Sequence, residues 1–272
     1  MSNALGIGIG GLQIDFLGIE HVVLRPGNAS QNGTRSELLV VDAEAANGGL
    51  HQRLLVGFVV DGEIFGESLI ADAQRFDIPA QRAHALYIDG QRAWRRVDDL
   101  AAPTKGFIVL AQAGVGIPGA STRGFERVVV QSAFWQPLSR LWELTGKAEA
   151  GAVIAGDRVG VPSELLFRTG GDTTVRGYAF QSLGLKQGDA VLPVRYYTVL
   201  SIEATRWIND SLGVATFVDA GNAFDELSDF KLAVGYGMGL RLRTPIGPFR
   251  LDLAYGEQSR QVRLHFSVGL AF

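Results

Sequence analysis

The chain has 272 residues, of which 47% are hydrophobic and 19% are charged, and its formal net charge is −3. With no basic tract, this charge gives no support for nucleic-acid binding, and the absence of cysteine excludes disulfides, thiolate metal sites and cysteine nucleophiles. No uninterrupted apolar run reaches the ~18 residues of a transmembrane helix, whereas a barrel strand needs only ~9–11 residues of alternating polarity.

The first half of the chain reads as short strands separated by turn-rich stretches. Turns are expected near residues 26–35, 43–50, 61–63, 77–83, 97–103, 118–123 and 136–140. They delimit seven strands, including one at 64–76, and a further pair would lie within residues 5–24. Residues 6–11 satisfy the GxGxxG pattern, but no βαβ unit follows, so we interpret these glycines as part of a strand.

The last third of the chain alternates strictly between apolar residues and polar or small residues. Because successive side chains of a strand point to opposite faces, residues 232–243 and 262–272 each form one apolar face and one polar or small face. Three side chains represent the apolar, outer face: Leu240, Leu251 and Phe266. Three neighbours represent the opposite, inner face: Arg241, Asp252 and His265.

The connections between these strands alternate in length, and the one at 155–194 is very long. A soluble β-sandwich also has alternating strands, but short turns at one end and long loops at the other are typical of transmembrane barrels. The sequence therefore predicts one domain, residues 1–272: an all-β transmembrane antiparallel barrel of 12–14 strands, with the long extracellular loop folded into its lumen. Four tryptophans fall near strand ends, where aromatic girdles form: Trp94, Trp135, Trp142 and Trp207.

The long connection carries the residues with the clearest functional character. A loop of ~40 residues without its own secondary structure is usually functional or disordered, and Gly170 and Gly171 would give it a hinge. Arg176 is the only charged residue in 173–180. Inside a lumen it would need partners, because an unpaired buried charge is very costly. Strand parity offers two inward carboxylates directly after the loop, Glu203 and Asp219.

The segment RTGGDTTVRGY at 168–178 resembles the loop motif of the BamA/TamA superfamily of outer-membrane assembly barrels. The resemblance runs from about residue 103 to the C-terminus and includes FVDAGNAF at 217–224 and GMGLRLRTPIGPFRLDLAYG at 237–256. Within the superfamily, these motifs resemble those of TamA most closely. It implies that the loop motif with Arg176, Gly177 and Tyr178 is held to Glu203 and Asp219 on the inner barrel wall. Five predicted strands follow the loop, as in the sixteen-stranded family barrel.

Two features depart from the family pattern. Eleven strands should precede the loop, whereas the sequence gives seven to nine, and the periplasmic POTRA domains are missing. No export signal is visible before the first strand. We therefore expect the chain to be a fragment, or the export signal to lie upstream.

The resemblance implies a bacterial outer-membrane barrel that assembles, inserts or translocates outer-membrane or autotransporter proteins. It implies no cofactor, and the scattered histidines show no metal spacing. The implied partners are outer-membrane lipids, client β-barrel or secreted proteins, and an inner-membrane or periplasmic protein that binds the missing N-terminal domains. A two-partner secretion pore and a passive channel remain alternatives; an enzyme is disfavoured because no nucleophile–base set is present. The last strand ends in a stripe that resembles an assembly signal: Phe266, Val268, Leu270 and Phe272.

Overall fold

The computed structural model of the protein describes residues 5–9, 12–16, 21–26, 39–47, 50–61, 83–100, 102–188, 190–244 and 247–269, with side chains from residue 83 onward. Apart from two short 3-10 turns, Ser163–Leu165 and Leu227–Asp229, the regular elements are strands. In chain order the strands are β1 Leu5–Ile9, β2 Leu12–Phe16, β3 His21–Pro26, β4 Leu39–Asn47, β5 Leu50–Asp61, β6 Ala83–Val97, β7 Gly106–Gly116, β8 Phe125–Pro137, β9 Trp142–Ile154, β10 Leu185–Gln187, β11 Ala190–Leu192, β12 Tyr196–Trp207, β13 Leu212–Phe224, β14 Ala233–Thr244, β15 Gly247–Gly256 and β16 Gln261–Val268.

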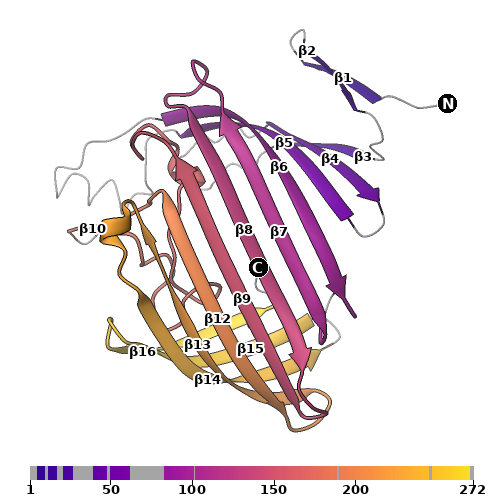
Figure 1. The fold of residues 1–272 in the computed structure, drawn as a ribbon, viewed down its shortest axis with the longest axis vertical. Helices are drawn as coiled ribbons and strands as arrows, with labels where there is room; N and C mark the ends of the chain where they lie inside the picture. Colours follow the sequence, from indigo (N-terminus) through magenta and orange to yellow (C-terminus); the bar gives the residue numbers. More distant parts are fainter. Residues whose placement is uncertain are drawn as a thin grey trace.

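Twelve of these strands form one antiparallel sheet in the order β16-β15-β14-β13-β12-β9-β8-β7-β6-β5-β4-β3. The sheet is strongly curved (Figure 1). Its described ends are β16 and β3, which do not pair with each other in the part of the chain that the structure describes. Strands β1 and β2 pair only with each other, and so do β10 and β11. The predicted all-β antiparallel fold and the five strands after the long loop are thus confirmed.

One predicted strand is misplaced. The turns expected at 61–63 and 77–83 delimit a predicted strand at 64–76, in a segment that lies outside the described residues. Strand β5 pairs directly with β6, from Leu50 opposite Trp94 to Asp61 opposite Ala83, so no strand is inserted between them in the sheet. The prediction was wrong because two turn-rich stretches in one connection were interpreted as the two ends of a strand.

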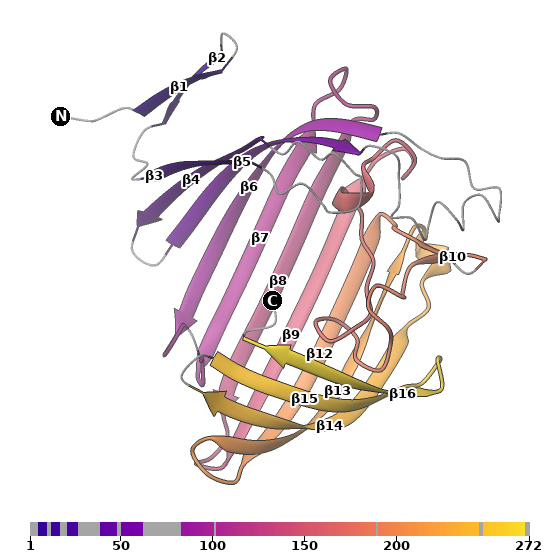
Figure 2. The ribbon, with the colours of Figure 1, turned by 180° about the vertical axis from the view of Figure 1, so that it is seen from behind.

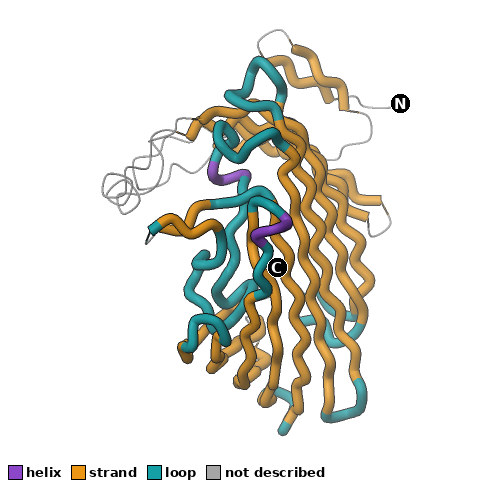
Figure 3. The backbone as a smooth tube through the Cα atoms, turned by 60° about the vertical axis from the view of Figure 1, so that its left-hand side comes forward, coloured by secondary structure: helices purple, strands orange, loops and turns teal. Residues whose placement is uncertain are grey.

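The connections fall into two groups at opposite ends of the sheet. One end has the connections 98–105, 138–141 and 208–211 and the tight turn between Thr244 and Gly247, and we call it the short-turn end. The other end has connections 117–124, 155–195, 225–232 and 257–260, and we call it the long-loop end. The longest connection lies along the concave side of the sheet (Figures 2 and 3). We call that side the lumen.

The two faces of the sheet follow the predicted parity. On the outer face Leu240, Leu251 and Phe266 expose 43%, 40% and 59% of their surface. On the lumen face Arg241 and Asp252 are buried, and His265 lies directly opposite Asp252. Large apolar side chains that stay exposed over a whole face are typical of a surface that contacts lipid.

The tryptophans only partly follow the prediction of a girdle. Trp94 and Trp142 are exposed on the outer face. Trp135 is buried in the lumen, and Trp207 also faces inward, where its indole nitrogen donates to Glu143. Position near a strand end was therefore a weaker guide than strand parity, which assigns Trp135 and Trp207 to the inner face. Among the described residues, no helix is long and apolar enough to cross a membrane.

Consecutive residues near the middle of β8 test the assignment of the faces. Val130 is outside and 41% exposed, whereas Gln131 points inward and donates to Glu149. We predict that Val130→Arg lowers the free energy of unfolding in a bilayer by ~2–4 kcal/mol, because it puts a charge against lipid. Gln131→Arg should cost much less, because it stays beside a carboxylate. Urea unfolding in lipid vesicles measures both, and the reverse order would show that the register is shifted by one residue.

Candidate functional site

The long connection, residues 155–195, leaves β9 and returns to β12, which is the neighbour of β9 in the sheet. The nitrogen of Val153 donates to the carbonyl of Arg195, so the ladder closes where the loop leaves. Contrary to the prediction, the loop has regular structure of its own: the 3-10 turn Ser163–Leu165 and the small hairpin of β10 and β11. The connection is much longer than two neighbouring strands need, and its residues form a compact plug on the lumen face (Figure 3).

The tip of the loop folds on itself around two glycines. Gly170 and Gly171 have φ angles of 103° and 108°, a region that other residues rarely adopt. The nitrogen of Gln181 donates to the carbonyl of Gly170, and the bridge between Thr169 and Leu183 closes the turn. These contacts give the two glycines a turn-forming role in the folded loop, and their role as a hinge stays a prediction.

Arg176, at this tip, binds Asp219 of β13 through three hydrogen bonds. Its Nε donates to Oδ2 at 2.7 Å, its Nη2 donates to Oδ1 at 2.8 Å, and its backbone nitrogen donates to Oδ2 at 3.0 Å. The planar guanidinium therefore grips the carboxylate with two parallel bonds, the geometry that arginine is suited to form. Asp219 is completely buried and Arg176 is only 6% exposed.

The remaining nitrogen of the same guanidinium binds two more carboxylates. Nη1 donates to Glu203 of β12 at 3.0 Å and to Asp252 of β15 at 2.9 Å. Arg241 of β14 binds the same two carboxylates from the other side, at 2.5 and 2.6 Å to Glu203 and at 2.6 Å to Asp252. We call these five buried residues the arginine hub: Arg176, Glu203, Asp219, Arg241 and Asp252.

The hub holds three carboxylates and two guanidinium groups, and this excess of negative charge stabilises the charged form of the loop arginine. Burial alone would lower the pKa of Arg176, but the hydrogen bonds and charges of Asp219, with those of Glu203 and Asp252, raise it above its ordinary value. The guanidinium also lies 3.4 Å from the ring centre of Phe217, where a cation–π contact adds to its stabilisation. The loop thus contributes a cation that three strands of the wall require.

Glycines on the lumen face make room for the loop and for the carboxylate of Asp252 at this point. A Cβ atom on Gly235 of β14 would lie 1.8 Å from the carbonyl oxygen of Arg176, and one on Gly239 would lie 1.8 Å from Asp252 Oδ1. A Cβ on Gly256 of β15 would lie 2.5 Å from the carbonyl oxygen of Gly177. The small residues that alternate along β14 therefore let the loop backbone lie directly on the wall.

The residues after Arg176 extend the contact to the last strands. Gly177 has φ of 90° and donates its backbone nitrogen to His265 Nε2 of β16 at 2.9 Å. Tyr178 is buried, and its hydroxyl lies within hydrogen-bond distance of the carbonyl of Val234 and of the side chain of Gln258. Every strand from β12 to β16 therefore contributes a residue that binds the 176–178 segment. The turn between β15 and β16 adds Gln258.

The structure brings together the three charged residues that were expected to meet, Arg176, Glu203 and Asp219. Sequence reasoning missed that Asp252 and Arg241 join them and that His265 accepts from the loop. The signal was present, since parity put all three on the lumen face. What it could not give was the curvature of the sheet, which brings β15 and β16 to the same loop residues as β12 and β13.

A second set of contacts holds the earlier part of the loop to the other wall. Arg127 of β8 donates from Nε to the carbonyl of Leu165 at 3.0 Å and from Nη1 to Gln112 at 3.0 Å. Lys147 of β9 donates to the carbonyl of Thr173 at 2.5 Å. We call Arg127 and Lys147 the second anchor. Because it binds backbone carbonyls, it depends on the path of the loop more than on the loop side chains.

The residues of the expected C-terminal signal are only partly described. Phe266 and Val268 lie on the outer face of β16, with 59% and 51% of their surface exposed. Leu270 and Phe272 lie outside the described residues. The role of the stripe in assembly stays a prediction. No group of three or more histidine, cysteine or acidic side chains in the described part of the chain is arranged to hold a metal ion.

Comparison with known proteins places this architecture in a family. The Omp85 superfamily domain matches residues 81–272, which include the loop, the hub and all strands from β6 to β16. The chain belongs to the Omp85 superfamily. Omp85 barrels are membrane proteins that work without covalent catalysis, in agreement with the prediction that this chain is not an enzyme.

Two relatives show how far the likeness extends. The chain is 34% identical over 110 residues to the chloroplastic outer envelope protein 80 of Arabidopsis thaliana, which covers 38% of this chain and 14% of that protein. Its fold matches the crystal structure of BamA from Haemophilus ducreyi lacking POTRA domains 1–3, with a TM-score of 0.64 and 16% identity over 91% of this chain and 57% of that one. The chain therefore spans a minor part of the first relative and a little over half of the second.

We predict that Arg176→Ala lowers the free energy of unfolding by about 3–5 kcal/mol, because it leaves buried carboxylates without their counter-charge. Arg176→Lys should recover only part of the loss, since an ammonium group cannot reproduce the two parallel bonds to Asp219. Urea unfolding in lipid vesicles measures the change. Arg168→Ala is the matched control, because among the described residues this loop arginine donates only to the carbonyl of Val191. Equal stability of Arg176→Ala and Arg168→Ala would contradict the prediction.

The second anchor should act separately from the hub, because the two sets of contacts share no residue. We predict that Arg127→Ala speeds hydrogen exchange of loop amides at 161–174 and leaves those at 176–178 protected, whereas Arg176→Ala does the reverse. The destabilisations of the two variants should add in the double variant to within ~0.5 kcal/mol. Simultaneous deprotection of the whole loop by either single change would show that it is held as one unit.

Proposed function

We propose that the chain, residues 1–272, is the barrel domain of a protein that inserts, assembles or translocates other membrane or secreted proteins. The observation that carries the proposal is the arginine hub, in which a lumen loop is fixed to the wall by a buried arginine and three carboxylates. A diffusion channel has no need of such a plug. A machine that must keep its lumen sealed while its wall strands change partners does.

We also propose a specific branch of the family, on the sequence motifs alone. The loop motif and the segments at 217–224 and 237–256 resemble TamA most closely in wording, and we infer that the clients include outer-membrane and autotransporter proteins. We also infer a bacterial outer membrane as the location. The similarity to a protein named for the chloroplast outer envelope makes an organelle outer membrane the alternative.

The sheet edge suggests how such a barrel would act. Strand β16 pairs with β15 along one side, and its other side has no strand partner in the described part of the sheet. Free backbone donors and acceptors at an edge can template an incoming strand. The apolar outer face of β16, with Leu264 at 68% and Phe266 at 59% exposed, would keep that strand at the level of the lipid. Hydrogen bonding, without covalent chemistry, would then drive assembly.

We infer three classes of partner. The exposed outer face would bind outer-membrane lipids, and the edge of the sheet would bind client strands. A third partner, in the inner membrane or the periplasm, would act through POTRA domains of the kind that BamA has, of which domains 1–3 are lacking from its crystal structure.

A reconstitution assay tests the proposal. The chain is placed in lipid vesicles, an unfolded outer-membrane β-barrel is added, and protease-protected client is measured over time. We predict that the wild-type chain speeds client insertion over empty vesicles and that Arg176→Ala reduces the gain several-fold while the chain itself stays in the membrane. Arg168→Ala, the loop control, should retain the gain.

Conductance and client translocation distinguish the proposed function from the two alternatives. A passive channel would give a large, steady conductance in planar bilayers and no effect on client insertion. A two-partner secretion pore would move a soluble client across the vesicle membrane and leave barrel clients unfolded. Either result would overturn the assembly function.

A further inference from the structure

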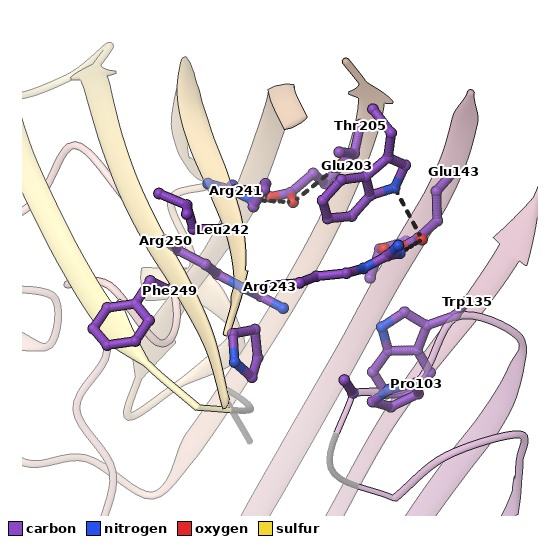
Figure 4. A pocket seen from close by; sticks show the side chains of 14 residues that line it. Pro103, Trp135, Glu143, Glu203, Thr205, Arg241, Leu242, Arg243, Phe249 and Arg250 are labelled. Carbon is purple, nitrogen blue, oxygen red and sulfur yellow. Dashed lines mark hydrogen bonds and ion pairs between the residues drawn. The ribbon is translucent and has the colours of Figure 1, made fainter. Parts of the chain in front are cut away.

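A cavity of about 50 Å³ lies at the short-turn end of the lumen, next to the arginine hub (Figure 4). A void of this size has room for a few waters or one small anion. Three arginines from β14 and β15 reach it, together with aromatic rings from β8 and β12. The lining residues that matter below are Trp135, Glu143, Trp207, Arg241, Arg243 and Arg250.

Two of the three arginines have carboxylate partners. Arg241 is bound to Glu203 and Asp252 within the hub. Arg243 donates to Glu143 of β9 at 3.0 Å, and its guanidinium lies 3.6 Å from the ring centre of Trp207. In Figure 4, dashed lines join each of them to its partner, whereas none reaches Arg250.

Arg250 is partly buried and forms no hydrogen bond or ion pair with the residues that the structure describes. The position of Arg250 in the sheet makes the lack of a carboxylate partner unfavourable. It lies directly opposite Arg241 on β14, and its other neighbour, on β16, is the neutral Ser267. Like charges directly opposite each other destabilise a sheet, so an arginine at this position needs a reason other than pairing within the wall.

The carboxylates nearby are already engaged. Glu203 accepts from both Arg241 and Arg176, and Glu143 accepts from Arg243 and from the indole nitrogen of Trp207. Arg250 therefore balances the excess negative charge of the hub only at longer range, and its donors have no acceptor within the described part of the chain. Since guanidinium is suited to bind a carboxylate through two parallel bonds, the missing partner is best supplied from outside.

We propose that this cavity binds a carboxylate group, with Arg250 as the main donor and Arg243 beside it. The rings of Trp135 and Pro103 at the cavity wall would contact the apolar part of the molecule that carries the carboxylate. The carrier is either a free small carboxylate or the C-terminus of a peptide. The inference is independent of the proposed function, because the cavity would bind the same group in a passive channel.

Iodide reports on the site, because it is an anion that quenches tryptophan fluorescence and Trp135 and Trp207 line the cavity. The full chain is titrated with iodide in lipid nanodiscs at constant ionic strength. We predict a saturable quenching component in the wild type and its loss, or a roughly tenfold to hundredfold weaker affinity, in Arg250→Gln, as expected for one charge-assisted contact. Arg140→Gln, in an exposed turn at the same end, is the matched control and should keep it.

Arg250→Lys guards against misfolding, since it keeps the charge and should retain weaker saturable quenching. The neutral quencher acrylamide should act equally on all variants, which shows that access to the rings is unchanged. Strictly linear iodide quenching in the wild type, or equal saturable quenching in the wild type and Arg250→Gln, would overturn the proposal.

Competition identifies the carrier. Acetate and a short peptide with an aromatic C-terminal residue are tested for displacement of iodide, with the C-terminally amidated peptide as control. Tighter competition by the free peptide than by acetate supports a peptide C-terminus, and equal competition supports a free small carboxylate. If neither carboxylate displaces iodide, or if the amidated peptide competes as well as the free one, the cavity is not a carboxylate site.

Discussion

The structure depends on the burial of one guanidinium group inside the lumen. An arginine that is 6% exposed is tolerable only where carboxylates surround it, and here they come from three different strands. The wall has the complementary difficulty, because Asp219, Glu203 and Asp252 would repel one another without the loop. Neither half is well placed alone, so the loop position and the strand positions are determined together.

The plug is held in two chemically different ways. At the hub, opposite side-chain charges are paired, so substitution of any of these residues directly weakens the attachment of the loop. At the second anchor, Arg127 and Lys147 bind carbonyl oxygens of the loop, which any sequence provides. The loop therefore touches both the β6–β9 wall and the β12–β16 wall. Movement of either wall relative to the other would strain one set of contacts before the other, which makes the loop sensitive to the shape of the barrel.

The sequence predicted those features that depend on period-two alternation and on local turns. Parity alone assigned Arg241, Asp252 and His265 to the lumen and Leu251 to the outside, and it singled out Glu203 and Asp219 as partners of the loop. It failed where the answer depends on three-dimensional curvature or on which segments pair. Asp252 meets Arg176 because the sheet bends, and the strand expected at 64–76 is not inserted because β5 and β6 find each other directly. Trp135 was expected in an outer girdle because it lies near a strand end. It faces the lumen instead, and the prediction failed because the face of the strand was not considered.

The ion pair between Glu143 and Arg243 has a geometric consequence for the whole wall. Strands β9 and β14 are separated by β12 and β13, so the path along the sheet covers three inter-strand spacings of about 4.8 Å, roughly 14 Å. Two side chains can join at 3.0 Å across that interval only along the chord of an arc. Flattening of the wall lengthens the chord and separates the charges. The pair can therefore form only while this end of the wall stays curved, so it reports on the curvature of the sheet at the short-turn end.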